Sequence, residues 1–283
     1  MEESYNGILV VDKPGNMTSR DVVNIVSNVL KTRKIGHTGT LDPLATGVLV
    51  LTIGKYTKLT EFLTSTFKTY EVEMVLGYAT DTLDVTGKKI KKSDKTITND
   101  ELIGVIKSFI KTYEQEVPIY SAVKINGKKL YEYARNDEIV ELPKREVCIS
   151  DIRDIEIVNE SVKFTCEVSK GTYIRSLVRD IGEKTGTYAT MSKLRRIKQG
   201  DFDIREAYSL EGIKNNTYKI LGLNDILTGY PVENIDDVKY KEIINGVKQK
   251  YDYKSDYLVF KYDDKYVALY RKSDDYYKMY VKF

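Results

Sequence analysis

The chain has 283 residues, enough for one large domain or for a large domain with a smaller one beside it. It is 41% hydrophobic and 31% charged, as in an ordinary soluble globular protein. The longest apolar run, around residues 48–51, is far shorter than the ~20 residues of a membrane-spanning helix. The acidic residues after Met1 lead directly into a strand-like run, so we expect no signal peptide, no membrane association and a cytoplasmic protein.

The cysteine and histidine content excludes two further classes of protein. Cys148, Cys166 and a single histidine cannot form a disulfide framework or a conventional zinc site, and they fit a reducing compartment. Cys166 alternates with polar residues within 162–168, so we expect it among core side chains as a structural residue rather than as a reactive thiol. The sequence therefore predicts no metal site.

Charge is distributed unevenly along the chain. The net charge is only +3, from 45 basic and 42 acidic residues. Residues 170–200 contain eight basic and two acidic residues, so this segment carries 8 − 2 = +6 and the rest of the chain sums to −3. A local basic patch on a nearly neutral protein is typical of a polyanion partner. The same charges would equally fit the solvated face of a helix.

The first 54 residues predict a strand, a helix and a second strand. Residues 7–12 are a continuous apolar run, typical of a buried strand. Thr18 or Ser19 can cap a helix. Its apolar residues follow a period of 3.6: Val22, Val23, Val26, Val29 and Leu30. Residues 35–43 are too rich in Gly and Thr for a regular element, and 47–54 predict a second buried strand.

From Tyr70 onward the apolar period changes to two, which indicates strands. One face is expected to carry Tyr70, Val72, Met74, Leu76 and Tyr78. Residues 88–95 are polar and basic and predict an exposed loop, and a helical pattern follows at 102–109. Strands mixed with helices, without regular strand–helix–strand alternation, favour an α+β fold with a mixed or antiparallel sheet.

Composition changes near residues 229–231. The segment 231–283 holds ten of the 23 tyrosines and is typical of short strands separated by charged turns. We therefore expect two domains, 1–230 and a small, mostly β domain at 231–283.

One nucleotide-binding motif and one catalytic set can be set aside. Gly47 and Gly54-Lys55 are spaced wrongly for a phosphate-binding loop, and Lys55 is not followed by Ser or Thr. Beyond the single His37 there is no basis for a Ser/His/Asp set. Asp42 stands before Pro43 in a Gly/Thr-rich loop, where the backbone can approach a ligand closely, although a turn role is common for Asp-Pro.

Several motifs in order along residues 7–200 resemble bacterial tRNA pseudouridine synthases of the TruB family. They are Lys13-Pro14, GHTGTLDPLATG (36–47), KTYE (68–71), TDTLDVTG (80–87), YSAVK (120–124), SKGTYIR (169–175) and LRR (194–196). The segment 231–283 matches weakly, and its assignment as the family's PUA-like RNA-binding domain rests on its position.

The resemblance implies that the protein isomerises uridine 55 in the T loop of tRNA to pseudouridine without a cofactor. Asp42 matches the family's essential aspartate, whose carboxylate must be ionised to act as a nucleophile or to stabilise charge on the sugar. Arg175 matches the arginine that pairs with this aspartate, through two hydrogen bonds. Tyr70 matches the tyrosine that stacks on the target base, so the implied catalytic set is Asp42, Tyr70 and Arg175.

The resemblance also implies a set of substrate-binding residues. Tyr173 and Leu194 match positions that line the base pocket. His37 matches the histidine that enters the space left by the flipped base, where a neutral ring suits insertion between bases. Asp84 matches a residue that helps to order the Asp42–Arg175 pair. By the same resemblance the partner is tRNA, held at its T arm and at its acceptor end by the C-terminal domain, and the enzyme requires no protein partner. Nothing in the sequence indicates a stable oligomer, so we expect a monomer.

Two other functions remain open at the level of sequence. A non-catalytic tRNA-binding or tRNA-folding module on the same scaffold would be expected to lack Asp42, Tyr70 or Arg175, and all three are present. An N-glycosidase that hydrolyses uridine would use Asp42 with Asp81 or Asp84 as a pair of carboxylates. Free uracil among the products would identify the glycosidase.

Overall fold

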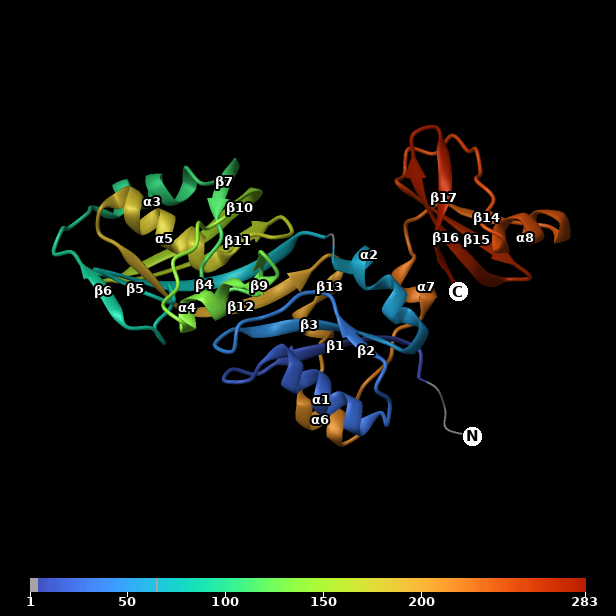
Figure 1. Cartoon of the computed structure of the whole chain (residues 1–283), viewed down its shortest axis with the longest axis horizontal. Helices are drawn as coiled ribbons and strands as arrows, with labels where there is room; N and C mark the ends of the chain where they lie inside the picture. The colour runs from blue at the N-terminus through green and yellow to red at the C-terminus, as the bar shows by residue number, and fades with distance from the viewer. Residues whose placement is uncertain (1–4, 65) are drawn as a thin grey trace.

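The computed structural model describes residues 5–64 and 66–283, which form one large mixed sheet with helices and a separate small sheet near the C-terminus (Figure 1). The helices are α1 Ser19–Val29, α2 Thr60–Thr64, α3 Asn99–Lys107, α4 Leu130–Arg135, α5 Ile174–Thr185, α6 Leu210–Lys214, α7 Leu223–Ile226 and α8 Asp237–Ile244, with 3-10 turns at Gly54–Leu59 and Ile204–Glu206. The strands up to residue 140 are β1 Gly7–Lys13, β2 Ile35–His37, β3 Thr46–Ile53, β4 Lys68–Leu76, β5 Tyr78–Thr80, β6 Lys89–Lys92, β7 Thr112–Glu116, β8 Lys124–Ile125 and β9 Lys128–Lys129. Those that follow are β10 Lys144–Val158, β11 Ser161–Val168, β12 Ala189–Gln199, β13 Phe202–Asp203, β14 Val232–Asn234, β15 Tyr257–Tyr262, β16 Lys265–Ser273 and β17 Tyr276–Lys282.

The large sheet has nine strands in the order β1-β3-β12-β4-β11-β10-β7, with β2 paired to β3 and β13 to β12. Its pairings are antiparallel except for β3 with β12, which are parallel. This arrangement confirms the predicted α+β class. The β3–β12 pair joins two halves of the sheet, and each half carries its own helices (Figure 1).

Apolar cores lie between this sheet and three sets of elements: α3 with α5, α1, and α2 with the C-terminal sheet. Helices α3 and α5 bury Leu102, Ile106 and Leu177 against strands β4, β10, β11 and β12, and the predicted helix at 102–109 is therefore confirmed. Helix α1 covers β1 and β3 with Val22, Val23, Val26 and Leu30, as its period predicts. Its cap is Thr18, whose side chain accepts a hydrogen bond from the Asp21 amide while the Asp21 carboxylate accepts one from the Thr18 amide.

Three local predictions were wrong. Residues 35–37 form the short strand β2, because the backbone there pairs with the edge of β3 despite its Gly-rich sequence. Residues 89–92 are exposed, as expected, but they form strand β6 rather than a loop, because they pair with β5. The alternation from Tyr70 ends at Leu76, since Gly77 has a φ of +101° and redirects the chain before Tyr78.

Strands β14 to β17 form a four-stranded sheet with α8 beside it, as expected for a small, mostly β C-terminal unit. This sheet contacts the rest of the protein through a cluster of aromatic rings. Phe62, on α2, meets Tyr230 and Tyr257 with ring centroids 5.5 and 4.8 Å apart. Because this contact is apolar, the C-terminal sheet packs directly against the rest of the protein and is not joined to it by a linker alone. The division at residue 230 stays a prediction.

Two observations bear on the excluded classes. Cys166 is completely buried in the core below α5, and burial raises the pKa of its thiol, so it has the structural environment expected of it. Within residues 5–64 and 66–283, no helix is both long and apolar enough to cross a membrane.

The β3–β12 junction depends on one glycine. Gly47 has a φ of +101°, and a Cβ atom built on it would lie 2.2 Å from the carbonyl oxygen of Arg196. We expect Gly47→Ala to lower the free energy of unfolding by about 2 kcal/mol or more, because the strained φ and the backbone clash add. Urea unfolding followed by circular dichroism measures this change.

Gly104→Ala is the matched control. Gly104 lies in α3 with no atom within 4 Å of its Cβ position, so alanine should raise stability by about 0.5 to 1 kcal/mol. An unchanged urea midpoint for Gly47→Ala would show that the junction tolerates a side chain.

Candidate active site

An ion pair between Asp42 and Arg175 lies where the two halves of the sheet meet. Asp42 is in the loop between β2 and β3, and Arg175 is the second residue of α5. The Arg175 Nε donates to one Asp42 carboxylate oxygen at 2.8 Å, and its Nη2 donates to the other at 3.3 Å. The sequence places these residues 133 positions apart, and the structure brings them together as the resemblance implies.

Each nitrogen of the Arg175 guanidinium donates a hydrogen bond. Besides Asp42, its guanidinium donates to the carbonyl oxygens of Thr82 and Tyr120, each at 2.9 Å. Only 5% of its side chain is exposed, against 36% for the side chain of Asp42. The arginine is therefore a fixed support, and the carboxylate is the member of the pair that an outside molecule can reach.

The loop that carries Asp42 is fixed by side chains from distant parts of the chain. The Leu41 amide donates to the Ser19 hydroxyl at 2.9 Å, and Arg196 Nη2 donates to the Gly39 carbonyl at 3.1 Å. Lys13 donates to Met17 and, at 3.4 Å, to Pro43, and burial lowers the pKa of this lysine to about 8. These contacts set the position of Asp42 before any substrate binds.

A cavity of about 280 Å³ opens beside the pair. Its lining comes from five segments of the chain: residues 38–42, Thr64 with Lys68 and Tyr70, Ser121 with Ala122, residues 170–175, and Leu194 with Arg196 from β12. A pocket of this size with a few convergent polar groups is typical of a small-molecule or single-nucleotide site.

Three predicted residues form its walls. Tyr70 on β4, Tyr173 at the start of α5 and Leu194 on β12 all line the cavity. Tyr70 and Leu194 are each only 7% exposed, so each presents a small apolar surface to the interior of the pocket. The Tyr173 amide donates to the side chain of Gln115 at 2.8 Å, which fixes the entry to α5.

Asp84 lies outside the cavity lining, in the loop after β5. Its carboxylate accepts hydrogen bonds from the Thr82 hydroxyl and the Thr86 amide, both at 2.9 Å. Thr82 in turn supplies a carbonyl to Arg175, so Asp84 orders the loop that supports the arginine. Asp81 also bonds within its own loop and does not line the cavity, so neither residue forms a carboxylate pair with Asp42 across the pocket.

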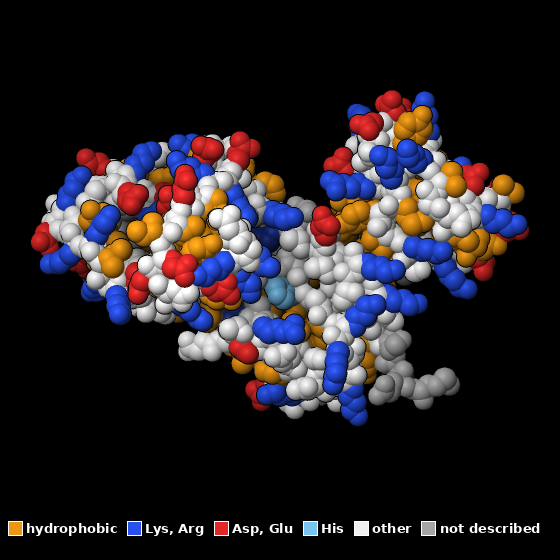
Figure 2. Space-filling model, viewed as in Figure 1, with side chains coloured by type: hydrophobic (Ala, Val, Ile, Leu, Met, Phe, Trp, Pro, Cys, Tyr) orange, Lys and Arg blue, Asp and Glu red, His pale blue; other side chains and the backbone are white. Residues whose placement is uncertain are grey.

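His37 lies on β2, one residue before the cavity lining begins at Thr38. Partial burial, with Arg196 and Arg20 nearby, lowers the pKa of His37 below its usual value, so its ring is neutral at pH 7. Its Nδ1 atom is buried without a hydrogen-bond partner in the described part of the chain. Figure 2 shows this histidine, in pale blue, at the centre of one face with lysine and arginine side chains around it.

Sequence reasoning missed several cationic and polar residues of the pocket. Lys68, Lys170 and Arg196 line it, and burial lowers the pKa of Lys68 to about 8. Lys68 lies within the KTYE motif and Arg196 within LRR, but no periodicity or spacing distinguishes a lining lysine from a surface one. Together with Arg175 they outnumber the single carboxylate of Asp42, which makes the cavity attractive to an anion.

Ser121 was also missed. It is 7% exposed, it lines the cavity, and its hydroxyl has no hydrogen-bond partner among the residues that the structure describes. A buried hydroxyl without a partner costs free energy unless a ligand or water satisfies it. The YSAVK motif was the only signal for this position.

The basic segment 170–200 is not a uniform patch. Arg179 pairs with Glu116 and Asp180, Arg195 pairs with Asp12, and Lys193 pairs with Glu73. Arg175 and Arg196 are buried. Most of the positive charge of this segment is therefore neutralised within the protein, because carboxylates far away in the sequence pair with its basic side chains. Lys170, which belongs to this segment, lines the cavity and has no carboxylate partner among the described residues.

The described residues contain no cluster of three or more potential metal ligands.

Two family models match adjacent parts of the chain. Residues 27–174 match the N-terminal domain of TruB family pseudouridylate synthases, and residues 175–227 match the C-terminal domain of tRNA pseudouridylate synthase B. The boundary between the two matches falls between Ile174 and Arg175, so the Asp42–Arg175 pair joins them. Both matches end before β14, so the assignment of 231–283 as a PUA-like domain remains a prediction.

Relatives of known name agree with these matches. The chain is 46% identical over 241 residues to tRNA pseudouridine synthase B of Caldicellulosiruptor saccharolyticus, covering 85% of this chain and 82% of that protein. It is 42% identical to the protein of the same name from Staphylococcus aureus strain MRSA252, with 94% of each covered.

Solved structures show the same fold at lower identity. A Cbf5-Nop10-Gar1 complex matches with a TM-score of 0.71 and 24% identity, over 98% of this chain and 85% of that one. An H/ACA RNP bound to a substrate RNA containing 2'-deoxyuridine matches with a TM-score of 0.70 and 23% identity, over 98% and 84%. With its sequence matched along most of its length and its fold shared, the chain belongs to the TruB family of pseudouridylate synthases.

Proposed function

We propose that this protein isomerises a uridine of tRNA, uridine 55 in the T loop, to pseudouridine. The observation that carries the proposal is the Asp42 carboxylate, held by two hydrogen bonds from a buried arginine at the edge of a nucleotide-sized cavity. The relatives named tRNA pseudouridine synthase B support tRNA as the substrate. The resemblance of the motifs around Asp42, Tyr70 and Arg175 supports the T-loop position.

The reaction exchanges one bond of the ribose for another. The bond from C1′ to N1 of the uracil breaks, the base turns, and a bond from C1′ to C5 forms. The proton lost from C5 is balanced by the proton gained at N1, so no oxidant, water or cofactor enters the balance. Asp42 acts either as a nucleophile or as the group that stabilises positive charge on the sugar.

The pocket walls suit a base removed from its stack. Extruding a stacked base costs a few kcal/mol, which contacts inside the pocket must offset. Tyr70 offers a flat ring to the uracil, and its hydroxyl is a candidate for proton transfer at C5. Tyr173 and Leu194 complete the enclosure, and neutral His37 lies beside the cavity where it can enter the space that the base leaves.

The C-terminal sheet is assigned to tRNA binding outside the pocket, as a PUA-like domain acting on the acceptor end. Its apolar contact with α2 supports a fixed orientation relative to the active site. We propose that the protein works as a cytoplasmic monomer without a protein partner.

An unmodified tRNA transcript incubated with the purified protein and no cofactor tests the proposal. Carbodiimide labelling and primer extension would locate pseudouridine, with free uracil measured in parallel. Pseudouridine at position 55 supports the proposal. Released uracil would instead identify an N-glycosidase, and tight binding without product would identify a non-catalytic module.

Asp42→Asn removes the charge while keeping the shape of the side chain. We expect the rate of pseudouridine formation to fall by about 1,000-fold or more, because neither nucleophilic attack nor charge stabilisation survives. Affinity for tRNA should change only several-fold, since contacts elsewhere supply most of the binding. Single-turnover kinetics and filter binding measure the two quantities.

Asp12→Asn is the control for this variant. Asp12 also accepts two hydrogen bonds from an arginine, Arg195, and its side chain is 33% exposed, but it does not line the cavity. Normal turnover by Asp42→Asn would refute the catalytic assignment.

Arg175→Lys keeps the positive charge but cannot make the four hydrogen bonds of the guanidinium. We expect kcat to fall by about 10- to 100-fold, the range that corresponds to losing one or two hydrogen bonds to a charged group. Arg179→Lys, which disturbs an arginine paired with carboxylates outside the cavity, should retain activity. Equal losses in both variants would show that the effect is on stability rather than on Asp42.

Ser121→Ala tests whether the unpartnered hydroxyl meets the substrate. We expect kcat/KM to fall by about 3- to 10-fold, as for one neutral hydrogen bond, while thermal stability stays level or rises because a buried unsatisfied group is removed. The control is Ser192→Ala, because the hydroxyl of Ser192 donates to Glu73. Unchanged kinetics for Ser121→Ala would contradict this contact.

A further inference from the structure

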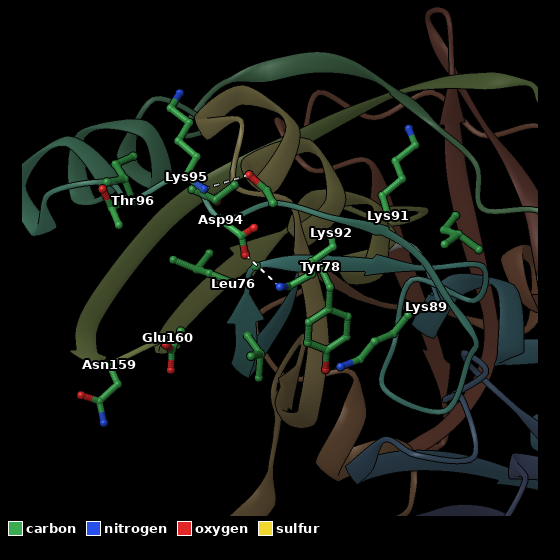
Figure 3. Close-up of a pocket in the computed structure, with 16 residues that line it drawn as sticks. Leu76, Tyr78, Lys89, Lys91, Lys92, Asp94, Lys95, Thr96, Asn159 and Glu160 are labelled. Carbon is green, nitrogen blue, oxygen red and sulfur yellow. Dashed lines mark hydrogen bonds and ion pairs between the residues drawn. The ribbon is translucent and has the colours of Figure 1, made fainter.

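A large hollow lies away from Asp42, around strands β5 and β6. These strands form a two-stranded sheet at the end of the molecule opposite the C-terminal sheet (Figure 1). The hollow has a volume of about 910 Å³ and is lined by this hairpin, the end of β4 and the turn at Asn159 and Glu160 (Figure 3). The active-site cavity shares none of its lining residues.

The hairpin is strongly basic. Residues 88–95 contain five lysines and one aspartate, so they carry 5 − 1 = +4 over eight residues. Every residue of β6 is exposed. This segment accounts for more charge than the whole chain's net +3, and it lies outside the basic segment at 170–200.

Most of these charges lack a counter-charge. Lys92 pairs with Asp94, but both side chains are more than three-quarters exposed, so the pair contributes little. Lys95 donates to the carbonyl of Thr185 at the end of α5, which is a structural contact. Lys88, Lys89 and Lys91 form no ion pair with any carboxylate in residues 5–64 and 66–283.

Two of the three unpaired lysines lie over tyrosine rings. The Lys89 ammonium is 4.1 Å from the ring centroid of Tyr78, and that of Lys91 is 5.4 Å from the ring centroid of Tyr188. Figure 3 shows Lys89 extending along the Tyr78 side chain. A ring face attracts the cation and limits its motion without using its hydrogen-bond donors. The lysines are therefore partly positioned for an external anion.

The Asp81 carboxylate connects the β5–β6 hairpin to the loop that supports Arg175. Asp81 accepts hydrogen bonds from the amides of Lys88, at 2.8 Å, and Thr82, at 2.9 Å. The Thr82 carbonyl then accepts from Arg175 at 2.9 Å. The same loop therefore carries the start of the hairpin and one of the carbonyls that support Arg175.

We propose that the β5–β6 hairpin binds the sugar–phosphate backbone of the tRNA whose uridine enters the cavity, with Lys88, Lys89 and Lys91 as its phosphate contacts. Lys89 and Lys91 line the open hollow and Lys88 precedes them in the chain, and repeated, unpaired cations match a repeated anion. A protein partner is less suited, since the only large apolar side chain exposed on β6 is Ile90. The identity of the RNA rests on the proposed function, but the surface lies outside the catalytic cavity.

The test neutralises the three lysines together, as Lys88→Gln, Lys89→Gln and Lys91→Gln in one variant. Filter binding of the full tRNA is measured from about 50 to about 200 mM salt. We expect affinity at low salt to fall by about 10-fold or more, and the slope of log affinity against log salt to become shallower by about 2 to 3. The rate at saturating tRNA should not change, because no contact of Asp42 or Arg175 is removed.

Two control variants separate charge from structure. Replacing the same lysines by arginine should preserve the salt slope. Replacing three exposed lysines elsewhere in the chain, Lys107, Lys111 and Lys144, by glutamine changes the net charge equally and should leave the slope nearly unchanged. Equal slopes for the hairpin variant and this last control would overturn the proposal.

An isolated T-arm hairpin RNA, tested alongside the full tRNA, locates the contact. If the salt slope of the variant is shallower with both RNAs, the contact lies in the T arm. If it is shallower with the full tRNA alone, the contact lies beyond the T arm. Either result supports the β5–β6 hairpin as a surface that binds the RNA backbone. Pseudouridine assays on the same samples keep the proposals separate. A reduced slope with no product from any variant would overturn the isomerase and leave the hairpin surface standing.

Discussion

The buried guanidinium of Arg175 is the interaction on which the site depends. A charge this far from water is stable only if it is paired and hydrogen-bonded on every side. Its partners come from three separate loops, through Asp42, Thr82 and Tyr120. Holding one arginine therefore requires the three loops to take fixed positions, and Asp42 is positioned as a consequence.

The sheet supplies the frame for this convergence. The parallel β3–β12 pair brings the end of the Asp42 loop beside Leu194 and Arg196, and Gly47 permits the close backbone approach. Arg196 is buried with backbone carbonyls as its partners, at Val48 and Gly39. Burial, with the charge of Arg196 as a smaller cause, lowers the pKa of Lys13, Lys68 and His37, so the two lysines hold their protons less tightly than usual.

The local sequence pattern predicted the long helices and strands well, but it missed short strands. The period of Val22, Val23 and Val26 identifies α1, because one face of that helix is buried along its length. Strands β2 and β6 were missed because their pairing partners, rather than their own residues, determine them. The Asp42–Arg175 pair followed from motif resemblance, since no local rule connects residues 133 positions apart. Ser121 and the counter-charges of the basic segment required the three-dimensional contacts.

The chemistry and the affinity for RNA are assigned to different parts of the molecule. A cavity of about 280 Å³ can enclose one nucleotide, and contacts to one nucleotide cannot offset both base extrusion and the immobilisation of a large RNA. Binding free energy must therefore come from surfaces outside the cavity. The β5–β6 hairpin and the C-terminal sheet lie at opposite ends of the long axis, with β3 and β12 between them (Figure 1). Strand β12 contributes Leu194 and Arg196 to the lining of the cavity. An extended polyanion held at both ends would present its central loop to Asp42, so that the distant contacts supply binding free energy while the residues of the cavity carry the chemical step.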